Sequence, residues 1–468
     1  MSSVTKCFKD PATIDNRKAA ARRAAPCGRL LAALVATLAA ATATGFQTQS
    51  ADAAPSTVAV PAPKATLFDN VRVFDGDRLL GTRDVLIQDG VIVRIAHHIP
   101  QPSHCNRIEG KGLTLLPGLM DAHVHVIPSG PADAARFGVT TVFDLYTLVE
   151  PGKLAGWRRR RSSLLQSNEA DVWSAGAGVT PPGGHPTEMM TDLPAGSPTV
   201  PLLGPTDDPA AFVAARVREG SDFIKVIEDD GRRHPGDHAF LKSFGPQREV
   251  AVIKAAKATG LRVLIHVQQA DAARIAVDAG VDALAHAVAD RVPTPSEIAS
   301  MARHKTVLIP TLAVYSGLAG TGFSSRLAAQ PTVTSSLTAF QKMMLNIVLP
   351  KPDPSQFAVA MAHTRAAHRA GVTILAGTDA PNPTTAFGIS LHQEMELLVQ
   401  AGLTPSEAIS AASGNVARFF GTSDRGKIAV GLRADLLLVR GDPMKDISAS
   451  RNIAGVWKNG YLIPRTVQ

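Results

Sequence analysis

The chain has 468 residues, 45% of them hydrophobic and 19% charged, a balance that excludes an intrinsically disordered or membrane-embedded protein. This length is sufficient for one large barrel plus a smaller domain, with a sizeable buried core. The formal net charge of +8 is no evidence for an acidic partner, because residues 1–54, with seven Lys and Arg against three Asp, supply half of it.

Residues 1–54 are predicted to be a signal peptide. Their basic start is followed by an Ala/Leu/Val run from Leu30 to Ala43 and by Ala51-Asp52-Ala53, a pattern that signal peptidase accepts. The run is too short and too rich in alanine for a membrane span, so no stable membrane insertion is expected. The sequence therefore favours a periplasmic or secreted protein, cleaved near Ala53 or near Ala43. The alternative is a disordered N-terminus with an internal start.

The cysteines agree with export. Cys7 and Cys27 lie in the leader, which leaves Cys105 alone in the mature chain. An intramolecular disulfide is therefore excluded, and stability must come from the core.

Both ends of the mature chain are predicted to be rich in β-structure. After a Pro/Ala/Ser linker at residues 55–63, the alternating runs of residues 64–113 are broken by Asp75-Gly76 and Asp89-Gly90, which are hairpin signals. The same pattern returns in residues 422–468. We therefore expect a small discontinuous β-sandwich built from both ends of the mature chain.

The middle of the chain, residues 114–421, alternates apolar strand-like runs with Ala-rich helical stretches, which is typical of a parallel α/β fold. Eight such repeats predict a closed (β/α)8 TIM barrel, whose working residues sit at the C-terminal ends of the strands. The eight runs are 115–125, 140–145, 172–179, 223–228, 262–267, 283–287, 307–312 and 373–379. The helices between them include 209–220, 247–259, 270–279, 295–304 and 356–370.

The first of these runs, LLPGLMDAHVHV from Leu115 to Val126, carries Asp121, His123 and His125 at its end. Because side chains on a strand alternate with a period of two, these three are expected to point the same way. Burying polar groups at the end of an apolar run costs desolvation energy, which a bound metal ion commonly offsets. A bare His-x-His also occurs as hydrogen-bonded core residues, so the hypothesis needs ligands on other strands.

Four later runs supply such ligands. Lys225 lies in the middle of the fourth run, His266 ends the fifth, His286 ends the sixth and Asp379 ends the eighth. Taken singly, each His is compatible with a core position, the Lys with a nearby aspartate as its partner, and the Asp with a turn or helix cap. Together, at the expected ends of parallel strands, they favour a metal site.

The motifs LLPGLMDAHVHV, FIKVI, LIHV, LAHA and AGTDAP, with GKIAVGLRADLLLVRGDP near the C-terminus, follow one another in a familiar order. This order resembles the amidohydrolase superfamily of metal-dependent hydrolases, particularly its imidazolonepropionase-like and Xaa-Pro dipeptidase or ochratoxinase-like members. The resemblance covers essentially all of the chain after the leader. Its metal motifs are specific to the superfamily, whereas its substrate-facing loops are specific to no activity.

The resemblance implies two divalent metal ions, most often Zn2+, that activate a shared water molecule. Asp379 would then be the catalytic residue that takes the proton from this water and passes it to the leaving amine. Carboxylation of a buried lysine is chemically reasonable, because an amine with a lowered pKa is nucleophilic and two cations stabilise the carbamate. The implied ligands are His123, His125 and Asp379 for the first ion, His266 and His286 for the second, and N6-carboxylated Lys225 as the bridge.

Two further positions are candidates for substrate contact. Gly183, Gly184 and His185 follow the third run, and relatives carry a similar Gly-Gly-His. His185 is therefore predicted to be a catalytic and substrate-binding residue that donates to the developing oxyanion, with an ordinary turn as the alternative. Tyr146, near the end of the second run, is a substrate-binding candidate whose alternative is simple packing.

Three further segments have either an undecided role or an accessory role. The acidic stretch Glu228-Asp229-Asp230 departs from the relatives, and it either recognises a cationic group on the substrate or is solvated. The four arginines at 158–161 are interpreted as a solvated face, and without interleaved aromatic residues they do not indicate nucleic-acid binding. Residues 316–354 are predicted to form an extended loop and a helix that cover the barrel mouth.

The sequence thus predicts a metal-dependent hydrolase that cleaves an amide (C–N) bond of a small peptide-like, N-acyl amino acid or cyclic-amide substrate with metal-activated hydroxide. One alternative is a lactonase, esterase or phosphotriesterase on the same metals. Another is a non-catalytic periplasmic metal-binding protein. The expected partner is a small-molecule substrate, and a homo-oligomer is compatible with the sequence.

Overall fold

A computed structural model of the chain describes residues 65–148, 152–189, 199–234 and 236–467. The predicted signal peptide and the predicted linker lie outside the described residues. In the part of the chain that is described, no helix is both long and apolar enough to cross a bilayer.

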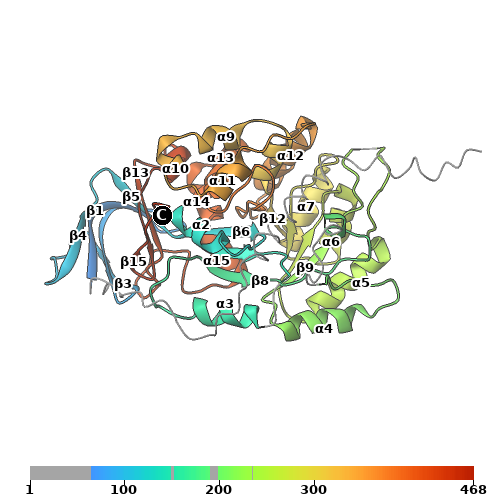
Figure 1. The fold of residues 1–468 in the computed structure, drawn as a ribbon, viewed down its shortest axis with the longest axis horizontal. Helices are drawn as coiled ribbons and strands as arrows, with labels where there is room; N and C mark the ends of the chain where they lie inside the picture. Colours follow the sequence, from blue (N-terminus) through green and yellow to red (C-terminus); the bar gives the residue numbers. More distant parts are fainter. Residues whose placement is uncertain (1–64, 149–151, 190–198, 235, 468) are drawn as a thin grey trace, which may run out of the picture.

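Strands from both ends of the described chain meet in one sheet, at the left of Figure 1. Its members are β1 (Ala65–Phe74), β2 (Leu79–Gln88), β3 (Val91–Ala96), β4 (Cys105–Glu109), β5 (Leu113–Pro117), β13 (Leu436–Arg440), β14 (Ile453–Lys458) and β15 (Tyr461–Leu462). They are ordered β15-β14-β13-β5-β1-β2-β3, with β4 beside β1. Phe68 of β1 and Trp457 of β14 pack edge to face with 4.8 Å between ring centroids, so the two ends share a core. These strands are connected in one sheet, and a second layer facing it is not defined. The two-layered sandwich therefore remains a prediction.

Gly118 divides two strands that the sequence analysis treated as one run. β5 ends before it, in the end sheet, and β6 (Leu119–Val124) follows it in a separate parallel sheet. The Gly118 amide donates to the Asp435 carbonyl at 2.7 Å, and a Cβ on this glycine would collide with the side chain of Thr140. Only glycine permits so close an approach of the backbone to a neighbouring strand. The end sheet therefore reaches Pro117 rather than the predicted boundary at residue 113.

The middle of the chain is a parallel α/β structure, as predicted. One sheet holds β6, β7 (Val139–Asp144) and β8 (Asp171–Ser174) in this order, and another has the order β12-β11-β10-β9. The strands of the second sheet are β9 (Ile224–Ile227), β10 (Val263–His266), β11 (Ala283–Ala285) and β12 (Val307–Ile309).

Helices alternate with these strands and cover them on the outside (Figure 1). Each predicted helix is present within a few residues of its expected bounds. The helices are α2 (Gly130–Arg136), α3 (Lys153–Arg161), α4 (Pro209–Glu219), α5 (Pro246–Lys257), α6 (Ala270–Asp278), α7 (Pro295–His304), α12 (Pro354–Arg369), α13 (Ile389–Gln400), α14 (Pro405–Ala411) and α15 (Gly414–Phe420), with short 3-10 turns η2 (Thr187–Met189) and η3 (Ile447–Arg451).

The predicted ring of eight continuous strands is not observed as such. The run 373–379 is not a strand, and β8 ends at Ser174 rather than continuing through the predicted run to residue 179. At Gly377 the backbone passes so close to Ile309 and His123 that a Cβ would collide with both, and Asp379 takes a positive φ, which interrupts a regular ladder. Isolated parallel bridges connect these irregular runs to their neighbours: Val179 to Val226, Leu308 to Ile374, and Val124 to Ala380.

Most of the extended loop that was predicted, together with a helix, for residues 316–354 is replaced by short helices, which lie within residues 312–345. Thr338 begins one of them with a reciprocal capping box to Gln341, and Gln341 also donates to the Phe387 carbonyl at 2.9 Å. Leu327, Val333 and Leu345 of this segment pack with Phe137 and Ile389 in one apolar cluster. The helices are α8 (Leu312–Leu318), α9 (Phe323–Ala328), α10 (Pro331–Thr334) and α11 (Ala339–Leu345).

The junction between the two sheets yields a first prediction. Gly118→Ala is expected to lower the free energy of unfolding by about 1–3 kcal/mol, because the new methyl group overpacks against Thr140. Thermal and urea denaturation measure this. The double variant Gly118→Ala/Thr140→Ala should recover part of the loss, since it removes the colliding atoms.

Gly156 in α3 provides the matched control, because a Cβ there meets open space apart from the end of the Arg159 side chain. Gly156→Ala should leave stability unchanged or raise it by up to about 1 kcal/mol through helix propensity. Equal stability of Gly118→Ala and the wild type would show that the junction tolerates a side chain.

Candidate metal centre

His123 and His125 lie at the C-terminal end of β6 and approach one carboxylate. The Nε2 atoms of His123 and His125 are 3.1 and 2.8 Å from Oδ1 of Asp379. One ligand atom from each of the three residues lies within 4.8 Å of the others. The structure thus brings His123 and His125 together with Asp379, a predicted ligand more than 250 positions later in the sequence.

Asp379 is held in place by the backbone around it. Its amide donates to the His123 carbonyl at 2.7 Å, and its φ of 58° lies in the left-handed region. Asp121 accepts from the Thr378 amide at 3.0 Å and from the Thr378 hydroxyl at 2.7 Å, which ties β6 to the residue before Asp379. Asp121 therefore helps to position Asp379 and is not itself part of the ligand group. The sequence had predicted that its side chain points the same way as His123 and His125.

His266 and His286 continue the site in the direction away from His125. Ring centroids are 5.3 Å apart for His125 and His123, 4.8 Å for His123 and His286, and 4.5 Å for His286 and His266. His185 stacks on His266 at 4.6 Å, so five imidazoles form a continuous row. His286 has a φ of 133°, a strained conformation of the kind that concentrates at functional sites.

Lys225 lies in β9 and is buried. Burial lowers its pKa to about 7, while the charges of Asp379 and Asp144 act in the opposite direction. Its Nζ has no hydrogen-bond partner among the described residues. The alternative from the sequence, a salt bridge with a neighbouring aspartate, is not found, because Asp229 bonds to other residues.

Three of the histidines use one nitrogen for a hydrogen bond and leave the other for the site. Nδ1 of His125 lies 2.9 Å from the Tyr146 carbonyl, and Nδ1 of His286 lies 2.8 Å from the Thr311 hydroxyl. Nε2 of His266 lies 3.2 Å from Oδ2 of Asp229. Histidines that bind metals in proteins usually have such a partner on the second nitrogen.

The electrostatics of the site favour neutral imidazoles beside an ionised carboxylate. Burial lowers the pKa of His123 to about 3 and that of His266 to about 4, and it holds the pKa of His286 well below its ordinary value. Burial alone would raise the pKa of Asp379, but the neighbouring imidazoles outweigh it and hold this pKa well below its usual range. At His125 the interaction with Asp379 outweighs burial and raises the pKa.

These side chains fit a divalent cation. Nδ1 of His123 and Nζ of Lys225 are buried with no hydrogen-bond partner among the described residues, and the close approach of His123 Nε2 to Asp379 Oδ1 at 3.1 Å lacks the alignment of a hydrogen bond. Leaving such groups unpaired costs about 1–3 kcal/mol each, and more for charged groups. Neutral imidazoles and a carboxylate are the donors that zinc and similar ions prefer. A cation between the imidazoles and the carboxylate would satisfy Nε2 of His123 and Oδ1 of Asp379 together.

The two substrate candidates have different environments. His185 lies next to His266, and its Nδ1 is 2.6 Å from Oε1 of Glu188, so its Nε2 is left for another partner. Tyr146 is buried, its carbonyl serves His125, and its hydroxyl has no partner among the described residues. Glu188 was missed in the sequence, because nothing marks an acid three residues after a histidine as its partner.

Glu228 and Asp229 of the acidic stretch after β9 are buried and satisfied within the protein, so they are not free for a cationic substrate group, whereas Asp230 is partly exposed. Glu228 accepts from the amides of Phe244 and Gly245 at 2.8 and 3.2 Å, just before α5 begins. Asp229 is buried and forms a salt bridge with Arg233. Asp230 bonds to the adjacent Arg232.

Arg158, Arg159 and Arg160 of α3 are exposed, as expected for a solvated face, and some of the four arginines also form ion pairs within the protein. Arg158 and Arg161 both contact the carboxylate of Asp222, at 3.0 and 2.7 Å, and Arg160 pairs with Glu169. These ion pairs reduce the uncompensated positive charge on α3.

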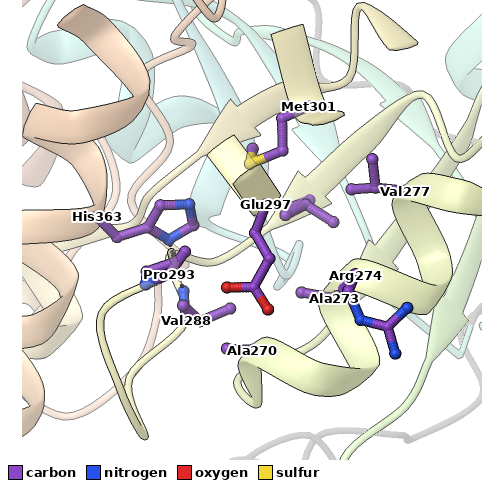
Figure 2. Close-up of a pocket in the computed structure, with 10 residues that line it drawn as sticks. Ala270, Ala273, Arg274, Val277, Val288, Pro293, Glu297, Met301 and His363 are labelled. Atoms are coloured by element: carbon purple, nitrogen blue, oxygen red, sulfur yellow. Dashed lines mark hydrogen bonds between the residues drawn. The ribbon is translucent and has the colours of Figure 1, made fainter. Parts of the chain in front are cut away.

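A recess lies between α6, α7 and α12 (Figure 2). Apolar residues line most of it, and Glu297, Arg274 and His363 provide its polar edge. Nδ1 of His363 accepts from the Val288 amide at 3.0 Å. The predicted ligands are not among its lining residues, so this recess is separate from the candidate metal centre.

Residues 174–463 match the model of the Amidohydrolase family. Because this stretch is more than half of the chain, the chain belongs to the amidohydrolase family, which confirms the resemblance drawn from its motifs. Membership in this family indicates a hydrolase that acts on carbon–nitrogen bonds.

Individual relatives are more distant. An uncharacterized protein of Mycobacterium tuberculosis is 31% identical over 236 residues, which are 50% of this chain and 55% of that protein, so the match spans about half the length of this curated relative. The imidazolonepropionase of Salinispora arenicola is 24% identical over 78% of this chain and 88% of its own. A crystal structure of a Xaa-Pro dipeptidase with bound methionine superposes with a TM-score of 0.65 at 23% identity, covering 85% of this chain and 99% of that one, and shows the shared fold.

The geometry predicts that His125→Ala lowers the divalent metal content of the purified protein, because it removes a ligand atom from the group around Asp379. Its side chain is partly exposed, so the variant is expected to fold. Elemental analysis gives the metal content, and circular dichroism checks the fold.

His392 of α13 is the matched control. It is buried, and its two nitrogens already contact the Ser450 hydroxyl and the Phe137 carbonyl. His392→Ala should lower stability by about 1–3 kcal/mol through lost hydrogen bonds and leave the metal content unchanged. Wild-type metal content in His125→Ala would count against the site.

Proposed function

We propose that the protein is a metal-dependent hydrolase that cleaves an amide (C–N) bond in a small peptide-like, N-acyl amino acid or cyclic-amide substrate. The observation that supports this most is the convergence of His123, His125 and Asp379, with further imidazoles and a buried lysine beside them. Family membership and the names of relatives that act on C–N bonds point the same way.

The fold supports the same proposal. The parallel runs follow one another in a circular order through the two sheets and the isolated bridges, as a (β/α)8 barrel requires. The histidine and aspartate candidates gather at the C-terminal ends of these runs, where the working residues of such barrels lie, and Lys225 lies within β9.

Two divalent ions, with Zn2+ the first candidate, fit the donor set. His123, His125 and Asp379 would hold one, His266 and His286 the other, and Lys225 would bridge them after carboxylation on Nζ. Such ions acidify a water molecule and polarise a carbonyl when bound. The low pKa of Lys225 supports carboxylation, because a neutral amine reacts with carbon dioxide.

The residues of the chain supply the proton transfers and the orientation. Asp379 is ionised, so its carboxylate would accept a proton from the attacking water and deliver it to the leaving amine nitrogen. His185 has its Nδ1 turned to Glu188, so Nε2 would donate to the developing oxyanion of the carbonyl. Delivery of a proton to the leaving group matters most for amides, since amines leave poorly without it.

A substrate panel tests the proposal. The metal-loaded protein should hydrolyse at least one of the Xaa-Pro dipeptides, N-acyl amino acids or cyclic amides faster than it hydrolyses lactones and phosphotriesters, and chelation should abolish this activity. Turnover confined to lactones, esters or phosphotriesters would favour that second reaction class. Tight metal uptake without turnover on the whole panel would favour a metal-binding protein.

Lys225→Ala is expected to remove most activity and about half of the bound metal, because a two-metal site loses its shared ligand. Short carboxylic acids added to this variant should restore part of the activity by replacing the carbamate. Lys458→Met is the control, because Lys458 is also buried but is paired with Asp171 and Asp435 at 2.7 and 2.8 Å. This control should lose stability, keep its metal and show no rescue, whereas full activity of Lys225→Ala would exclude the bridge.

A further inference from the structure

The carboxylate of Asp229 is the centre of a buried network next to the candidate metal centre. It accepts from Nη1 and Nη2 of Arg233 at 2.9 and 3.1 Å, from Nε2 of Gln269 at 2.9 Å and from the Gly231 amide at 2.8 Å. Its Oδ2 is also 3.2 Å from Nε2 of His266. A two-pronged guanidinium contact fixes both the position and the plane of a carboxylate.

This network decides which nitrogen of His266 carries the proton. A carboxylate bound by a guanidinium stays ionised and is an acceptor only, so Nε2 of His266 must be its donor. In a neutral imidazole the other nitrogen, Nδ1, then carries the lone pair. His286 has the opposite arrangement, because its Nδ1 faces the Thr311 hydroxyl and Nε2 is left over.

We propose that Asp229, held by Arg233 and Gln269, is a positioning residue that fixes His266 as the Nε2-protonated tautomer and so presents Nδ1 to a divalent ion. The inference rests on the proposed function, since it assigns a role towards the ions that this function requires. It also gives the acidic stretch after β9 a purpose that neither of the two readings of the sequence included.

The position of Asp229 in the chain supports this role. It lies four residues beyond Lys225, so β9 carries the lysine and leads directly to the residue that orients His266. Gln269 follows His266 by three residues and also donates to the Arg232 carbonyl at 2.8 Å, so the ends of two neighbouring strands are bound to each other. The ligand and its orienting group therefore move as one unit.

Zn2+ affinity tests the proposal. The apo protein is titrated with Zn2+ in competition with a chromogenic chelator, and the fold and melting temperature are measured in parallel. Asp229→Asn replaces the ionised acceptor of His266 with a neutral amide, which can either accept or donate and so no longer fixes the tautomer. We expect its affinity for one of two Zn2+ ions to fall about ten- to a hundredfold, as is typical when the partner of a metal-binding histidine is removed.

The single substitution leaves Arg233 without its charged partner, which can unfold the protein. A double variant tests the proposal in that case. Asp229→Ala/Arg233→Met removes both charges together, which buried ion pairs often tolerate. It should fold and should lose at least as much Zn2+ affinity as Asp229→Asn.

Asp171 is the matched control, since it is another buried carboxylate, bound by Arg425 and by Lys458 at 2.7 Å, with no histidine beside it. Asp171→Asn should lose stability and keep its Zn2+ affinity. Wild-type affinity in folded Asp229 variants that bind two ions, or an equal loss in Asp171→Asn, would overturn the positioning role and leave the proposed function standing. A wild-type protein that binds no Zn2+ would overturn the proposed function itself.

Discussion

The structure depends on burying polar side chains at the ends of apolar strands without giving them enough hydrogen-bond partners. His123, Lys225 and Asp379 are all buried; Nδ1 of His123 and Nζ of Lys225 have no hydrogen-bond partner among the described residues, and Asp379 has its Oδ1 close to two imidazole nitrogens. Burial of these groups destabilises the fold unless a cation or a chemical modification supplies the missing partners of the polar atoms. The strain at His286 and Asp379, both at positive φ, adds to this cost. The site therefore lowers the stability of the folded protein, which is expected of a functional centre.

The remainder of the fold keeps these side chains in position. Parallel pairing of β9 with β10 and of β10 with β11 places Lys225 on the strand beside the one that ends in His266, and His266 beside the strand that leads to His286. Asp121 fixes Thr378, and the close approach at Gly377 sets Asp379 beside His123. Around this centre, Tyr146, Thr311 and Asp229 each hold one nitrogen of a histidine. The site is thus oriented from several elements, and no single loop defines it.

The sequence predicted the parallel α/β middle, its helices and the residues that gather at the site, because strand periodicity and strand ends are local signals. It did not predict the break at Gly118, since a collision with Thr140 is visible only once β7 lies alongside. It predicted an extended loop and one helix for residues 316–354, where several short helices lie, because capped helices as short as α11 give a weak periodic signal. The partners of the histidines were also missed. Asp229 reads as one of three acids in a row until Arg233 and Gln269 fold around it.

Anomalous diffraction from crystals of the zinc-loaded protein tests the central claim most directly. The account predicts anomalous peaks among His123, His125 and Asp379 and between His266 and His286, with additional density on Nζ of Lys225. Crystals that hold zinc elsewhere and show no peak among these side chains would contradict it.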